Sequence, residues 1–278
     1  MSIQQTLIQP GIYPNLSNDD YHAHNSISRS KLMDFAVSPY TYWAMHINPN
    51  RPPKRTSKAF EIGQALHDFI LQPKLFEKEY DIEPKKILLK NTSRREFDAY
   101  KNECAALELS GKIILSFEDY KKLDEMRDRI LNYKEARELI EGARYEESYF
   151  WIDPETELLI KTKPDILHHN MSVDFKTTRD ASSRAFKGSI IEYGYHIQAA
   201  TVREGRKMCE QRHVPDFINL CIEKEYPYHI GIYIMEEEAI DKGHEEYRQL
   251  LVDLQRALAH NEWPDYPIET IGLPRWAV

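Results

Sequence analysis

Residues 157–178 read ELLIKTKPDILHHNMSVDFKTT, and this stretch decides the fold that we predict. Two runs rich in apolar and β-branched residues flank the turn HHN, which is the pattern of two strands joined by a short connection. Residues two apart in a strand point to the same side, so Asp174 and Lys176 share one face and Phe175 takes the other. If the strand that ends at Asp165 pairs with the strand that holds Asp174, two carboxylates and one ammonium meet at one end of a sheet.

Further strand and helix patterns surround this pair. The helical region after it is long enough for a crossover connection to the next strand. The N-terminal 27 residues are loop-like, and the tail after the last helix is too rich in proline for regular structure. We therefore predict one α/β domain over 1–278, a mixed central sheet flanked by helices, with 1–145 mainly helical and 146–278 forming the sheet core, the last helix and the tail. The predicted strands are 146–152, 157–167, 171–178, 216–224 and 229–235, and the predicted helices are about 28–38, 59–71, 96–109, 117–141, 182–211 with a break near 193–195, and 237–259.

Composition excludes several classes of protein. A chain of 278 residues with 41% hydrophobic and 29% charged residues is typical of a soluble globular protein. Its three cysteines, Cys104, Cys209 and Cys221, form no CxxC pair, which argues against a disulfide framework or a zinc ribbon and favours a reducing cytoplasm. There is no membrane span or secretion signal in the sequence. The net charge of −8 leans against a protein that coats polyanions, so any nucleic-acid contact is expected to be local.

Asp165, Asp174 and Lys176 are the residues that carry chemistry. Carboxylates are hard oxygen ligands that suit Mg²⁺ or Mn²⁺, and a neighbouring ammonium can orient an attacking water. Two metal-binding carboxylates and a neighbouring ammonium are the groups that hydrolysis of a phosphodiester requires. The motif is short, however, and a solvent-facing salt bridge, from Asp174 to Lys176 or from Lys163 to Asp165, is an alternative explanation of the same residues.

The strings PDIL and VDFKTT resemble the active-site motifs of the PD-(D/E)xK nuclease superfamily. The wider chain is similar to the nuclease domain of RecE-type exonucleases, through DDYHAHNSISRSKLMDFAVSPYTYW, FEIGQALHDFILQP, EESYFWIDPETELLIKTKPDIL, YHIQ and LPRWA. This resemblance covers most of the chain and implies a restriction-endonuclease-like fold. It also implies an origin in a virus or prophage.

The resemblance also implies roles for individual residues. Asp165, Asp174 and the backbone carbonyl of Phe175 would hold the divalent ions, and Lys176 would position or activate the water. His67 would complete the second ion position or touch its water shell, although a lone histidine on a core helix is often structural. Gly63, on the same helical face, would allow a backbone or the substrate to approach closely.

Two more positions match motif residues of relatives. Glu146 matches an acidic residue that precedes the PD strand, but its neighbour Glu147 would point to the opposite face and the assignment is open by one residue. Gln198 matches the glutamine of a QxxxY motif on the crossover helix. The tyrosine of that motif is replaced by Val202, so its hydroxyl is absent or comes from Tyr193 or Tyr195.

Substrate contacts are predicted near the N-terminus. The start of the first helix, with Ser28, Arg29 and Ser30, forms a plausible pocket for a terminal phosphate, because helix N-termini attract anions; ordinary helix capping is the alternative. The loop at 51–58, with Arg51, Lys54 and Arg55, and the basic stretch 85–95 are candidates for DNA backbone contacts, although charged loops are often simply solvated.

The predicted function is a Mg²⁺-dependent deoxyribonuclease, a processive 5′ to 3′ exonuclease on linear duplex DNA that yields 5′-mononucleotides and a 3′ single strand. The resemblance implies a ring-shaped homo-oligomer around double-stranded DNA and an annealing protein that takes the single strand. Two other functions remain open: a structure-selective endonuclease on the same fold, and a non-catalytic scaffold that binds DNA ends.

Overall fold

The computed structural model describes residues 8–52, 57–84 and 93–273. Its strands are β1 (Gly11–Tyr13), β2 (Tyr80–Ile82), β3 (Ile113–Leu115), β4 (Arg144–Tyr145), β5 (Ser148–Ile152), β6 (Leu159–Thr162), β7 (Ile166–Leu167), β8 (Met171–Thr178), β9 (Asp216–Glu223) and β10 (Ile230–Ile234). Its helices are α1 (Asn18–Ala23), α2 (Arg29–Val37), α3 (Pro39–Tyr42), the π-helix η1 (Trp43–Ile47), α4 (Lys58–Leu71), α5 (Pro73–Glu79), α6 (Arg94–Glu108), α7 (Phe117–Leu131), α8 (Lys134–Ile140), α9 (Ser183–Glu192), α10 (Tyr195–Glu210) and α11 (Glu237–His260).

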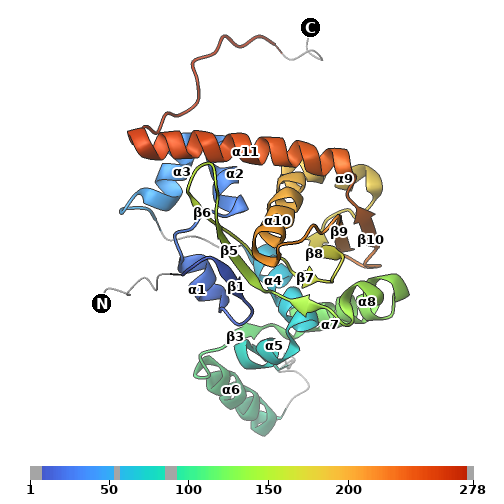
Figure 1. Cartoon of the computed structure of the whole chain (residues 1–278). Coiled ribbons are helices and arrows are strands. Elements are labelled where there is room, and N and C mark those ends of the chain that lie inside the picture. The colour runs from blue at the N-terminus through green and yellow to red at the C-terminus, as the bar shows by residue number, and fades with distance from the viewer. Residues whose placement is uncertain (1–7, 53–56, 85–92, 274–278) are drawn as a thin grey trace.

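The central sheet has five strands in the order β10-β9-β8-β7-β4. β8 and β9 are parallel, with Asp174 opposite Asn219, and the chain crosses between them through α9 and α10. All the other neighbours in this sheet are antiparallel. The predicted crossover and its break are confirmed, because Gly194 separates α9 from α10 in the left-handed conformation, with φ of 62°. The mixed α/β sheet flanked by helices is thus the observed fold (Figure 1).

The predicted strands at 146–152 and 157–167 are each wrong in one respect. The first begins two residues too early: β5 begins at Ser148, and Glu146 lies between β4 and β5 in a left-handed conformation with φ of 54°. The second is two strands, because Pro164 has no N–H to give to a ladder and the chain changes sheet there. β6 pairs with β5 in a separate sheet of order β1-β5-β6, whereas β7 pairs with β8.

Helices cover both faces of the central sheet. Val173 and Phe175 of β8 face a core shared with α4 and α7, which contains Leu66 and Met126. The side chains that alternate with them face α10, where Gln198 bonds Asp174. The second core lies between the β5–β6 pair and the helices α2, α10 and α11, and Figure 1 shows α11 running along this side of the molecule.

The N-terminal part holds more structure than the sequence predicted. β1 and α1 lie within the stretch expected to be a loop, and β1 pairs with β5. The aromatic stretch after α2 forms α3 and η1, and α5 with the parallel pair β2–β3 was not predicted. The helix expected over 117–141 is two helices, α7 and α8, that meet at Asn132 and Tyr133. The unpredicted strands and helices have three to seven residues each, which is too few for a hydrophobic period to identify them.

No helix in the described part of the chain is both long enough and apolar enough to cross a lipid bilayer.

Candidate active site

The site begins where the central sheet opens beside β8. β7 has only two residues in the ladder, opposite Val173 and Ser172, so the backbone N–H of Phe175 finds no strand partner on that side. In place of a strand, the Asp165 carboxylate bonds this group: its Oδ2 atom accepts a hydrogen bond from the Phe175 N–H at 2.7 Å. The predicted pairing through the HHN turn is therefore present, and it brings Asp165 next to the strand that carries Asp174.

Asp174 and Lys176 point to the face of β8 that α10 covers. The Lys176 Nζ lies 2.6 Å from Asp174 Oδ2, and Gln198 Nε2 donates to Asp174 Oδ1 at 2.6 Å. Asp174 is only 3% exposed, so the interpretation of this pair as a solvent-facing salt bridge is wrong. The alternative interpretation was an ion pair from Lys163 to Asp165. In the structure Lys163 pairs with Glu146 instead, with Nζ 3.4 Å from Oε2.

His67, Glu146 and Asp165 form a cluster of possible metal ligands. His67 of α4 lies with Nδ1 3.1 Å from Glu146 Oε1 and with Nε2 3.3 Å from Asp165 Oδ2. One ligand atom from each of these residues lies within 4.8 Å of the other two. Gly63, one turn before His67, lets α4 approach β8 closely, since a Cβ there would lie 3.1 Å from Thr177 Oγ1.

Glu146, and not Glu147, faces this cluster. Its left-handed backbone and its N–H bond to the Asp165 carbonyl, 3.1 Å, turn the side chain toward His67. Glu147 points elsewhere and pairs with Arg144 at 2.5 Å. Simple strand alternation could not separate the two, because residue 146 is not in a strand.

Burial and crowded charge shift the pKa values of these groups. Burial raises the pKa of Asp174 to about 6, even though Lys176 opposes the shift, and the Asp165 charge adds to it. Burial raises the pKa of Glu146 to about 7 against the opposing charge of His67. Burial alone would lower the pKa of His67, but the carboxylates of Asp165 and Glu146 outweigh it and raise that pKa to about 9.

The remaining two groups stay charged. Burial would raise the pKa of Asp165, but the His67 charge, together with Lys176, lowers it. Burial would lower the pKa of Lys176, but the two aspartates raise it above its ordinary value, so this side chain is an ammonium at neutral pH.

The donor set fits a hard divalent cation. Carboxylates from two residues and one imidazole converge within 4.8 Å. Burial raises the pKa of Glu146 and of Asp174, because it disfavours the charged form of each carboxyl group. A bound cation would favour the charged form of both groups. His67, Glu146 and Asp165 could hold one ion. Asp174 and the Phe175 carbonyl remain predicted as additional ligands.

Arg29 of the predicted phosphate pocket lies against the same site. Its Nε and Nη2 atoms are buried without a hydrogen-bond partner in the described structure, and its charge lowers the pKa of Asp174 while burial raises it. Ser28 caps α2 by accepting from the Lys31 N–H at 3.4 Å, and its hydroxyl contacts that of Ser30 at 3.0 Å. Capping and a phosphate pocket are thus compatible at this helix end.

The predicted DNA-contact loops are only partly described. Arg51 is exposed and donates to the Met45 carbonyl at 2.8 Å. Lys54 and Arg55 lie outside the described residues, as does most of the basic stretch 85–95.

Sequence reasoning missed Asn219 and left Tyr195 undecided. The Tyr195 ring lies 5.2 Å from Lys176 Nζ, whereas Val202 is buried in an apolar cluster. Asn219 stands next to Asp174 in the β8–β9 register, fully buried, and both its amide atoms lack a partner within the described ranges. An amide inside the apolar strand at 216–223 was the signal that could have identified it.

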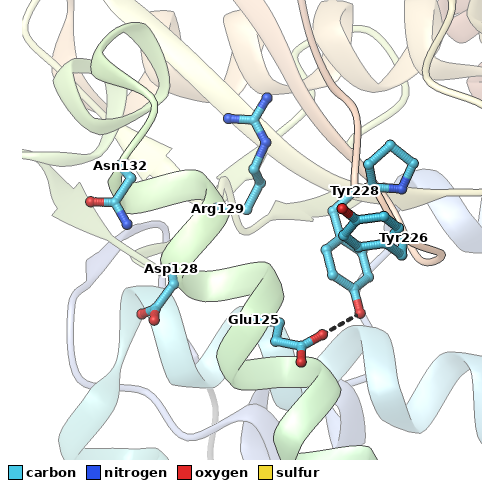
Figure 2. A pocket seen from close by; sticks show the side chains of 7 residues that line it. Glu125, Asp128, Arg129, Asn132, Tyr226 and Tyr228 are labelled. Atoms are coloured by element: carbon cyan, nitrogen blue, oxygen red, sulfur yellow. Dashed lines mark hydrogen bonds between the residues drawn. The ribbon is translucent and has the colours of Figure 1, made fainter.

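A separate cavity of about 450 Å³ opens between α7 and the turn that joins β9 to β10 (Figure 2). Glu125, Asp128 and Tyr226 are among the residues that line it, and Glu125 accepts a hydrogen bond from the Tyr228 hydroxyl at 2.9 Å. None of its lining residues belongs to the carboxylate cluster, so the cavity is distinct from the candidate active site.

Comparison with known proteins agrees with this fold. A family model described as "PDDEXK-like domain of unknown function (DUF3799)" matches residues 28–272. Fourteen chains of solved structures match, and one of them, from Eubacterium rectale, is described as a "Putative exonuclease". It has 15% sequence identity and a TM-score of 0.60, and the match covers 92% of this chain and 96% of that chain. No curated protein matches this chain.

Proposed function

Because this chain belongs to the PDDEXK-like family, and with it to the PD-(D/E)xK nuclease superfamily, we propose that it is a metal-dependent deoxyribonuclease of the RecE type. The proposed activity is processive 5′ to 3′ digestion of linear duplex DNA. The observation that carries the proposal is the buried Asp174, held by Lys176 and Gln198, lying close enough to Asp165 of the ligand cluster that the charges of the two aspartates and of Lys176 act on one another.

The reaction is hydrolysis of a phosphodiester. A water oxygen forms a bond to phosphorus, the bond from phosphorus to the 3′ oxygen breaks, and that oxygen takes up a proton, so the product is a 5′-mononucleotide. Asp174 accepts from Gln198 and pairs with Lys176, which fixes the direction in which the ammonium points. The Lys176 ammonium orients the attacking water and favours its deprotonated form electrostatically.

A divalent cation, held by His67, Glu146, Asp165 and the predicted ligands Asp174 and Phe175, would supply Lewis-acid stabilisation of the charge on the phosphate. Mg²⁺ is the proposed ion, with Mn²⁺ as the substitute, because both prefer the carboxylate and carbonyl oxygens that make up most of this ligand set. The protein's own contribution is to keep the side chains of the ligands at most 15% exposed, so that their charges act in a lower dielectric than that of water.

End-labelled linear duplex with Mg²⁺ tests the function. We expect release of 5′-labelled mononucleotide before any 3′ label, no digestion in EDTA, and an intact closed circle in the same mixture. A nicked or linearised circle would replace the exonuclease with the structure-selective endonuclease. Full binding of DNA ends with no hydrolysis in either Mg²⁺ or Mn²⁺ would favour the non-catalytic scaffold.

Arg29 is proposed to bind the phosphate at the 5′ end. The guanidinium is planar and its Nε and Nη2 lack partners among the described residues, which leaves two donors for phosphate oxygens. The Arg29→Ala protein is expected to lose about 10- to 150-fold of its preference for 5′-phosphorylated over unphosphorylated ends, the range for hydrogen bonds to a charged group. Rates on both ends measure that ratio, and Arg256→Ala is the matched control, because Arg256 is 68% exposed on α11 and pairs with Asp253. A preference equal to wild type in Arg29→Ala would remove the pocket from the proposal.

A ring of identical subunits around duplex DNA, and an annealing partner for the 3′ strand, remain part of the proposal. The described tail after α11 supports an assembly. Trp263 stacks on Tyr42 at 5.8 Å, and beyond it the chain leaves the body of the protein (Figure 1) with Tyr266 and Ile268 exposed. Light scattering of the purified protein gives the number of subunits.

A further inference from the structure

An aromatic path leads from the site to the surface. The Tyr195 ring has two cations nearby, Lys176 Nζ at 5.2 Å and Arg29 Cζ at 5.9 Å from its centroid. The Tyr193 ring lies 5.7 Å from the Tyr195 ring, at an interplanar angle of 39°. Tyr195 is therefore next to Lys176, and Tyr193 is the next ring outward from Tyr195.

The turn between α9 and α10 holds this path against α2. Gly194 sits between the two tyrosines in a left-handed conformation, and a Cβ there would lie 2.8 Å from Met33 Sδ and 3.6 Å from Arg29 Nη2. The absence of a side chain lets the turn approach the helix that carries Arg29. The same contact places Tyr193 beside the proposed phosphate pocket.

Tyr193 is exposed, and the ring behind it belongs to a group of stacked aromatic side chains. Half of its surface is open to solvent, and Ile191 beside it is 69% exposed. Behind it, Tyr195 stacks on Phe186 at 5.7 Å, and Phe186 stacks on Tyr233 at 4.9 Å. An apolar ring held in place on a solvent-facing turn offers a flat face at little cost in conformational entropy.

We propose that Tyr193 is a stacking platform for a nucleobase at the end of the DNA. The inference rests on the proposed function and adds a base-binding position to it. Arg29 and Lys176 supply positive charge for phosphates, and the neighbouring aromatic face takes the base of the same terminal region. Stacking needs only a π-face, so the contact works with any base, as digestion of arbitrary sequence requires.

Binding of duplexes that carry 2-aminopurine at the terminal position of either strand tests the inference without hydrolysis. Titrations are made in EDTA and in Ca²⁺. Wild type is expected to change the fluorescence of the probe at one end, and Tyr193→Ala is expected to bind DNA about 5- to 150-fold more weakly, the range for loss of one stacked base. Tyr193→Phe keeps the ring and is expected to restore both signals. The slope of log K against log salt is expected to stay the same, because no charge is removed.

Tyr226→Ala is the matched control, because Tyr226 is 84% exposed and lines the separate cavity shown in Figure 2. The inference is overturned if Tyr193→Ala binds as wild type does, if Tyr226→Ala loses as much affinity, or if wild type leaves the probe unchanged in both solutions. Failure of the proposed function looks different: wild type would bind and change the probe fluorescence but would not hydrolyse DNA in Mg²⁺ or Mn²⁺.

Discussion

Lys176→Met and Asp174→Asn proteins are expected to lose about 100- to 10,000-fold of the rate of DNA hydrolysis while remaining folded. Lys176 is a buried ammonium 2.6 Å from Asp174, and its raised pKa keeps it charged at neutral pH. Methionine keeps an unbranched side chain, one atom shorter, but removes the charge that orients water. Asparagine keeps the shape of Asp174 but removes the charge that holds the ammonium and the proposed cation.

The measurement is single-turnover release of nucleotide from end-labelled duplex, with thermal unfolding of each variant beside it. Lys242→Met serves as the control, because Lys242 is 60% exposed on α11 and its ion pairs within the described part of the chain are with Glu245 and Glu246 of the same helix. Near-normal hydrolysis by either site variant, or an equal loss in the control, would contradict the assignment of the active site.

His67→Asn and Glu146→Gln are expected to weaken the binding of Mg²⁺ and Mn²⁺ by at least about 10- to 100-fold, since even residues that only support a ligand have effects of that size. His67 and Glu146 supply two of the three converging donors. Calorimetric titration of the protein with each ion, without DNA, measures this loss independently of turnover. His46→Asn is the matched control, because His46 also pairs with a carboxylate, that of Asp34 at 2.7 Å, outside the cluster.

The pH dependence of ion binding follows from the same residues. With its pKa raised to about 9, His67 is protonated at neutral pH in the ion-free protein, and an imidazole must lose that proton before it can be a ligand. Ion affinity is therefore expected to rise with pH up to about 9. Below pH 7 the Glu146 carboxyl, with its pKa raised to about 7, also has to release a proton.

Titrations in buffers of different ionisation enthalpy count the protons released. About one proton per ion is expected at pH 8 for wild type, whereas any proton released by His67→Asn comes from Glu146, whose raised pKa is no longer opposed by the His67 charge. Release of no proton by wild type at pH 8 would mean that His67 lies outside the ligand set and acts only through the two carboxylates beside it.

Local sequence was enough for several parts of the site. Alternation along 171–178 placed Asp174 and Lys176 on one face and Phe175 on the other, as β8 shows. The period of α4 placed His67 on its inner side, and the break before α10 was visible in the chain itself. Each of these features depends on residues within about one or two turns of each other, whose side-chain directions the backbone alone fixes.

The sequence by itself therefore determined the strand that carries the aspartate and lysine, the helix that carries the histidine, and the crossover between the parallel strands. Only the tertiary structure decided that Glu146 rather than Glu147 faces the site, that the PD strand divides between two sheets, and that Arg29 meets Tyr195. The physical reason is the range of the interactions. Glu146 faces the site because its backbone is left-handed at the point where the chain passes from one sheet to the other. Arg29 lies near Tyr195 because segments far apart in the chain pack together, and no local period encodes such packing.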